Sequence, residues 1–214
     1  MKRMLMYGLL LYLPFLVAGP SAADERASAP APSVGAEGID AGDLRDGALF
    51  LPRWNLRLPA PAPGWSWWAL RRSSKDGPRN ESFLCLGPAG ERFIVTLLEN
   101  PSGSVDDAFV RGVREGVERT AAVIGMRYSD FQAQRTDVPL AGSYRLSATT
   151  EIPNGKGDWV QSISGSDVVY MLQTYLPQGG PTDVFDRFVA GLSLLRTEPL
   201  VQASGPEQPG PASF

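Results

Sequence analysis

The sequence predicts an α+β fold, a single domain in which an antiparallel sheet has helices packed on its faces. Three observations predict it. Alternating apolar and polar residues, the period of β-strands, occur both before and after residue 103. Each group of strand-like segments is followed by a segment with an apolar residue every three or four positions, the period of an amphipathic helix. The strands follow one another through short turns, without the regular strand–helix alternation of a parallel sheet.

The folded domain is expected to span residues 44–197. Residues 24–43 and 198–214 are rich in Pro, Gly, Ala and Ser and contain few large apolar side chains. Such segments bury too little surface to offset the entropy lost on ordering, so we expect a disordered linker and a disordered tail. The segment between them has the size of one ordinary domain.

The first half of the domain consists of predicted strands. Residues 48–59 (ALFLPRWNLRLP) predict a first strand, at a sheet edge because Pro52 cannot donate a hydrogen bond to a neighbouring strand. Residues 65–74 (WSWWALRRSS) predict a second strand. Residues 81–87 and 91–100 are joined by a tight Gly-Pro turn and predict a hairpin.

Residues 104–125 predict the first helix. Ser104 and Asp107 have the spacing of a capping box, and Gly125 supplies a stop at the C-terminal end. The apolar stripe of this helix consists of Val105, Phe109, Val113, Val117, Ala121 and Ile124.

Four more strands and a closing helix are predicted in the second half. Asn154-Gly155 is a strong hairpin signal between the second and third of these strands, so an antiparallel meander is expected. Residues 179–195 predict the helix, with Pro181 in its first turn. The four strand segments are RYSDFQAQRTDV, GSYRLSATTEI, GDWVQSIS and DVVYMLQTYL.

Several of these segments resemble the Mog1/PsbP-like α/β/α sandwich domains. The resemblance covers residues 48–197 and implies a small sheet with helices on its faces, an exported or compartmental location, and accessory, mainly non-enzymatic partners. The family carries no catalytic motif over to this sequence, and Trp67 and Trp68 match no part of its pattern. The segments that resemble the family are LRLPAPAPGW, SVDDAF, PLAGSYRLSA and VVYMLQTYLPQGGPTDVFDRFVAGLSLL.

The N-terminal segment predicts export. Two basic residues precede an apolar run from Met4 to about Gly19, and small residues before Asp24 suit cleavage by a signal peptidase. We therefore expect residues 1–23 to be a cleaved signal peptide and the mature protein to be periplasmic or secreted. The only cysteine is Cys85, so no cysteine stands at the new N-terminus to carry lipid, and stable membrane insertion is not expected after cleavage. The alternative is an uncleaved segment that anchors the chain in the inner membrane.

The composition excludes several classes of function. The sequence contains no histidine, which removes Ser-His-Asp and Cys-His sites and leaves poor ligands for zinc. It has no GxxxxGK[ST] or GxGxxG motif, so no nucleotide cofactor is expected. Because zinc lacks good ligands and no Asp-x-Asp-x-Asp-Gly calcium loop occurs, no metal is expected either. Removal of Lys2 and Arg3 would lower the formal net charge from −3 to −5, and an acidic protein is a poor partner for nucleic acid.

A Trp/Arg edge is the first candidate binding site. Trp67 and Trp68 are neighbours in one predicted strand, so their side chains point to opposite faces. Arg71 and Arg72 follow at a polar turn. Aromatic rings beside guanidinium groups suit a protein partner or an anionic, planar ligand, because these side chains supply contact area and directed hydrogen bonds. The alternative is that both tryptophans are core residues of a sheet covered on both faces.

Tyr170 and Tyr175 form the second candidate site. They have opposite parity in one predicted strand, so only one of them can share the face of Leu172 and Leu176. The other is a candidate for lining a groove.

These features predict a non-catalytic binding or accessory module that docks onto a protein partner outside the cytoplasm. One alternative is a carrier of a small apolar ligand, with a pocket between the sheet and a helix lined by Tyr, Met171 and Trp. The second alternative is a carboxylate-based hydrolase, because two acids across a cleft suffice for glycoside hydrolysis. Asp is also common at turns, which favours a structural role for the acids. The acids concerned are Asp130, Asp137, Glu151, Asp158 and Asp167.

Overall fold

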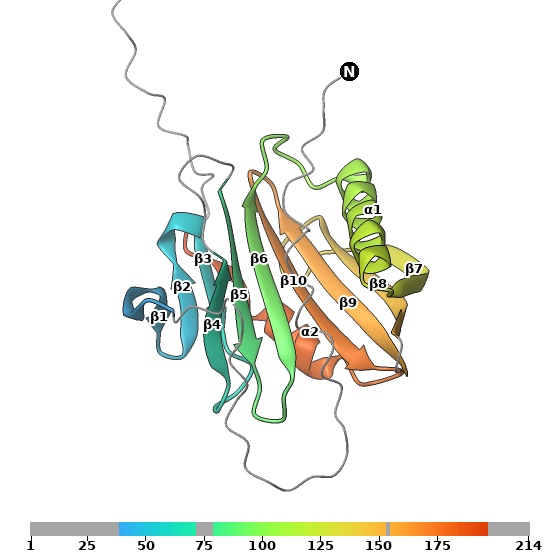
Figure 1. The fold of residues 1–214 in the computed structure, drawn as a ribbon. Coiled ribbons are helices and arrows are strands. Elements are labelled where there is room, and N and C mark those ends of the chain that lie inside the picture. Colours follow the sequence, from blue (N-terminus) through green and yellow to red (C-terminus); the bar gives the residue numbers. More distant parts are fainter. Residues whose placement is uncertain (1–38, 72–78, 153–154, 197–214) are drawn as a thin grey trace, which may run out of the picture.

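The computed structural model describes residues 39–71, 79–152 and 155–196, and in these residues the chain is mostly β-structure (Figure 1). The described strands form two antiparallel sheets, of four and seven strands, accompanied by two α-helices. The predicted fold class, an α+β sandwich with helices packed on the sheet faces, is therefore wrong. A second sheet provides much of the cover that the prediction assigned to helices.

The small sheet arises where the alternating pattern predicts one strand. Residues 48–59 form a hairpin instead, because Pro52 opens a 3₁₀ turn and Asn55 closes it. Asn55 has a φ of 54°, a left-handed conformation that asparagine tolerates better than most residues. The strands of this sheet, in spatial order, are β1 (Leu44–Arg45), β2 (Ala48–Leu51), β3 (Leu56–Pro59) and β11 (Ser193–Leu194).

The large sheet confirms the remaining strand predictions. The hairpin predicted around residues 81–100 and the meander predicted from residue 127 onward both form. Asn154 of the predicted hairpin turn lies outside the described residues, and Ile152 pairs with Gly155 on either side of it. The strands, in spatial order, are β4 (Ser66–Arg71), β5 (Asn80–Leu86), β6 (Arg92–Glu99), β10 (Val168–Pro177), β9 (Gly155–Gly165), β8 (Ser143–Ile152) and β7 (Arg127–Thr136).

Both predicted helices form, as α1 (Asp107–Val123) and α2 (Asp183–Ala190). The predicted capping residue of α1 is wrong, because Asp106 rather than Ser104 caps it, and its carboxylate accepts from the backbone N–H of Phe109 at 2.8 Å. The helix stops before Gly125, as predicted. α2 covers only the middle of its predicted range, and the chain after it enters β11.

The large sheet has a different cover on each face. On the outer face, α1 lies across the β7–β9 end of the sheet, and no described element lies in front of β4, β5 and β6 (Figure 1). On the inner face, the small sheet and α2 enclose the larger of two apolar clusters. The largest fully buried side chains of that inner cluster are Trp54, Phe83, Phe93, Phe185 and Phe188.

Candidate functional site

β4 places its two tryptophans on opposite faces, which confirms the predicted alternation. Trp67 lies on the inner face with 8% of its surface exposed, and its ring nitrogen donates to the carbonyl of Gly47 at 3.3 Å. Trp68 lies on the outer face and is 39% exposed. Trp67 therefore belongs to the core, and only Trp68 of the pair can meet a partner.

The two arginines of the predicted Trp/Arg edge cannot be placed. The structure describes the backbone of Arg71 but not its side chain, and it does not describe Arg72. The next described basic residue, Arg79, lies 3.4 Å from Glu99 in an ion pair and 5.1 Å above the ring of Trp54. A guanidinium group beside Trp68 stays a prediction.

Tyr170 and Tyr175 lie on opposite faces, as their parity predicts. The Tyr170 hydroxyl donates to the backbone carbonyl of Trp54 at 2.8 Å, and burial raises the pKa of Tyr170 to about 12. The Tyr175 hydroxyl is hydrogen-bonded to that of Tyr128 at 2.8 Å, and burial raises the pKa of both groups. Both predicted site tyrosines therefore use their hydroxyls inside the fold.

Met171 is packed in the outer apolar cluster under α1, near Tyr175. Its side chain is 5% exposed. These residues, which the carrier alternative assigns to a ligand pocket, are occupied in packing the helix onto the sheet.

Trp68 belongs to an apolar area on the part of the outer face that α1 leaves uncovered. We define the outer patch as Trp68, Leu84, Leu86 and Ile94. The strand register places Trp68 beside Leu84 and Leu84 beside Ile94. Leu84 and Leu86 are half-buried and Ile94 is buried, so Trp68 is the most exposed member. The sequence signal for the leucines is their parity in β5, opposite to that of Phe83.

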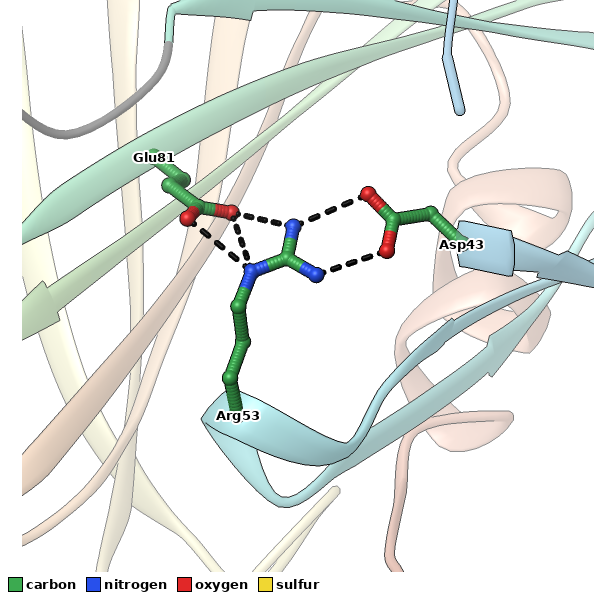
Figure 2. A network of polar contacts seen from close by, with 3 residues as sticks. All are labelled: Asp43, Arg53 and Glu81. Carbon is green, nitrogen blue, oxygen red and sulfur yellow. Dashed lines mark hydrogen bonds and ion pairs between the residues drawn. The ribbon is translucent and has the colours of Figure 1, made fainter. Parts of the chain in front are cut away.

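A partly buried ionic network connects the small sheet to the large one, and the sequence did not predict it (Figure 2). Arg53 donates to Asp43 at 2.6 and 2.9 Å and to Glu81 at 2.7 and 3.0 Å. The two carboxylates raise the pKa of the Arg53 guanidinium. Asp43, which composition places in the linker, is therefore part of the folded structure. All three guanidinium nitrogens bond to carboxylates, so this network is a structural connection.

Three of the five acids of the hydrolase alternative have partners within the fold. Asp137 accepts from the backbone N–H of Gly142 at 3.2 Å, and Asp158 accepts from that of Gly179 at 2.7 Å. Lys156 lies 2.7 Å from Glu151 and lowers the pKa of that carboxyl group. These are the contacts of turns and strand ends, the role that the sequence favours for them.

Comparison with known proteins does not assign a family. No family model matches the chain, and no curated protein matches it. A crystal structure from Bacteroides thetaiotaomicron VPI-5482 is similar with a TM-score of 0.40 and 11% sequence identity, over 67% of this chain and 46% of that chain. The aligned part is less than half of that protein, and likeness at this level defines neither family nor function. The resemblance to Mog1/PsbP-like domains stays a hypothesis.

Two further properties concern the described part of the chain alone. No three His, Cys, Asp or Glu side chains there are grouped so that they could hold a metal ion. Neither of the helices found there has the length and apolar character needed to cross a bilayer.

Proposed function

We propose that the chain is an exported, non-catalytic binding module that docks onto a protein partner through the outer patch. The exposure of Trp68 is the observation that carries this proposal. Tryptophan is enriched among the residues that dominate binding energy, because its ring supplies a large rigid contact area. A 39% exposed tryptophan on a part of the sheet that none of the described elements covers is available for such a contact.

The composition supports a protein partner and a non-catalytic role. The outer patch is apolar, so it suits a partner that buries apolar side chains against Trp68. The absence of histidine removes the most common general base from the sequence. Export is supported by the signal-like segment at residues 1–23, which lies outside the described residues.

A photo-crosslinking amino acid at position 68 tests the docking surface. We expect a cross-linked product of defined mass in the extracytoplasmic fraction, from which the partner is identified by mass spectrometry. The matched control carries the same amino acid at position 123, because Val123 is 81% exposed on α1, away from the outer patch. Equal cross-linking at both positions would contradict the proposal.

Affinity for the purified partner then tests the role of Trp68. Trp68→Ser should weaken binding by roughly thirtyfold or more, as expected for a residue that contributes at least about 2 kcal/mol. Val123→Ser should leave the affinity unchanged. Val123→Ser should keep the wild-type unfolding midpoint, whereas Trp68→Ser should lower it, because Trp68 is only 39% exposed and loses apolar contact area. Circular dichroism checks that both variants are folded at the temperature of the binding assay. Unchanged affinity of the Trp68→Ser variant would exclude the outer patch as the docking surface.

A further inference from the structure

The small sheet has a basic face on the side that points away from the large sheet. We define the arginine face as Arg45, Phe50 and Arg57, one residue from each of β1, β2 and β3. The register places Phe50 directly beside Arg57, and the Arg45 guanidinium lies 4.1 Å from the centre of the Phe50 ring. Leu49 and Leu51 point into the inner cluster, whereas Phe50 between them belongs to neither apolar cluster of the described residues. The alternation along β2 therefore places the arginine face toward solvent.

The two guanidinium groups of this face are available to an anion. Arg45 and Arg57 are exposed, and neither forms an ion pair with an acid in residues 39–71, 79–152 or 155–196. Asp46 is exposed in the turn between β1 and β2 and is not bonded to them. A guanidinium group binds a carboxylate through two parallel N–H donors. The chain as a whole has a net charge of −3, so these two cations form a local basic site on an acidic protein.

The chain leaves the described part of the structure close to this face. β11 pairs with β3, and the backbone of Arg196 after it is held by the side chain of Asn55, the residue before β3. Residues 197–214 contain two acids, Glu198 and Glu207, and no lysine or arginine. An extended chain advances by about 3.3 Å per residue. Glu198 is only two residues beyond Arg196, so it is within reach of β3.

We infer that residues 197–207 dock across the arginine face of their own domain. Adjacent strands lie about 4.8 Å apart, so the path from β3 to β1 is roughly 10 Å across the strands. The acids are nine positions apart in the sequence, which is ample chain for this distance. The order of side chains in the segment is also the order of their counterparts across the sheet. Glu198 pairs with Arg57, Leu200 and Val201 contact Phe50, and Glu207 pairs with Arg45.

Tethering favours this segment over an acidic segment of another protein. Exposed ion pairs contribute little free energy each, so two of them bind a separate peptide only weakly. A segment attached beside its own site has an effective concentration in roughly the millimolar range without any partner in solution. The segment has too few large apolar residues for a core of its own. The arginine face therefore supplies the contacts that its composition lacks.

Paramagnetic relaxation in the ¹⁵N-labelled mature chain tests the inference. Cys85 is buried, so a nitroxide label attaches selectively to the new thiol of a Ser204→Cys variant. We expect broadening of the backbone amide signals of Ala48 and Phe50. Because any segment attached at Arg196 stays near the small sheet, the informative quantity is the change in broadening between charge variants.

Removal of the two cations should release the segment. Arg45→Gln combined with Arg57→Gln should lower the relaxation enhancement at Phe50 at least twofold, as should 0.5 M NaCl in the parent protein, because salt screens exposed charges. The matched control is Arg111→Gln combined with Arg127→Gln, an equal change of charge at exposed positions on α1 and β7. The control should leave the enhancement unchanged. Equal enhancement with and without Arg45 and Arg57 would overturn the inference and leave the arginine face to an acidic partner.

Charge reversal tests the assigned pair. Arg57→Glu should lower the enhancement at Phe50, and addition of Glu198→Lys should restore it, because the pair then forms with the charges exchanged. Failure of Glu198→Lys to restore the enhancement would overturn the inference.

The arginine face and the proposed docking surface can fail separately. Trp68→Ser should leave the enhancement at Phe50 unchanged, since Trp68 lies on the outer face of the large sheet. Conversely, the Arg45→Gln and Arg57→Gln changes should leave affinity for a partner of the outer patch unchanged. Loss of that affinity in the arginine variant would contradict the independence of the two surfaces.

Discussion

Arg53 connects the two sheets through its ion pairs with Asp43 and Glu81. The side chains of Asp43 and Glu81 are only 10% and 9% exposed, while that of Arg53 is 32% exposed. The sequence gives no pattern for this network, because its members come from three separate segments. The tryptophan alternation could be predicted, since it depends only on neighbours within one strand.

Arg53→Ala should lower the free energy of unfolding by roughly 3 kcal/mol, because it removes the cation that is bonded to two largely buried carboxylates. Urea denaturation measures this. Arg187→Ala is the control and should cost at most about 0.5 kcal/mol, since its pair with Asp183 is exposed and within one helix. A similar loss of unfolding free energy in the two variants would show that the network does not stabilise the packing of the two sheets.

Cys85 should be unreactive in the folded protein. Burial raises the pKa of its thiol to about 12, so almost no thiolate exists at pH 8. Ellman's reagent should therefore label the folded protein negligibly and label it fully in concentrated urea. Rapid labelling of the folded protein would contradict the buried position.

The same thiol makes stability depend on alkaline pH. Because the folded pKa lies above the unfolded value of 9.0, the unfolded state loses its proton first, and the stabilisation is lost as pH rises from 9.0 toward 12. Cys85→Ala should reduce the fall in urea stability between pH 9 and pH 11. An identical fall in wild type and variant would contradict this contribution.

At the scale of elements, the helix α1 shows where sequence patterns are sufficient and where they are not. Its apolar stripe is confirmed at Val113, Val117 and Ala121, because that stripe follows directly from the helical period. The predicted start of the helix at Ser104 is not confirmed. Ser104 and Asp106 are both good capping residues, and only the path of the loop decides which of them caps the helix.

Asp106→Ala should destabilise the protein by about 1 kcal/mol, the usual cost of losing a capping side chain. Thermal unfolding followed by circular dichroism measures the change. Ser104→Ala is the matched control and should have little effect, because Asp106 supplies the capping bond. If Ser104→Ala destabilised the protein more than Asp106→Ala, Ser104 would be the capping residue instead.

The hairpin β2–β3 depends on Asn55 in two ways. Its backbone takes a left-handed conformation, and its side chain bonds to the backbone N–H and carbonyl of Arg196 at 2.7 and 2.9 Å. Asn55→Gly keeps the first property and loses the second, while Asn55→Ala loses both. We expect the unfolding midpoint to fall in the order wild type, Gly variant, Ala variant. Equal stability of the two variants would show that the backbone conformation contributes little.

At the scale of the whole molecule, the strands of the large sheet and the two helices could be predicted, but the small sheet and the class of the fold could not. The sequence pattern shows which strand faces are apolar, and it does not show which element covers them. Here the short hairpin β2–β3, with β1 and β11, covers inner-face positions such as Phe83 that the prediction assigned to helices.

The whole mature chain should begin at or near Asp24 if the N-terminal segment is a cleaved signal peptide. Mass spectrometry of the protein recovered from the extracytoplasmic fraction measures this directly. Residues 1–23 lie outside the described part of the chain, so the prediction depends on the sequence alone. Recovery of the intact chain in the membrane fraction would favour the anchored alternative.

The pairing of β11 with β3 means that the small sheet is built from both ends of the domain. A ribosome delivers β3 early and β11 last, so the hairpin β2–β3 keeps an open edge throughout synthesis. The domain can therefore complete its fold only after translation has passed Leu194.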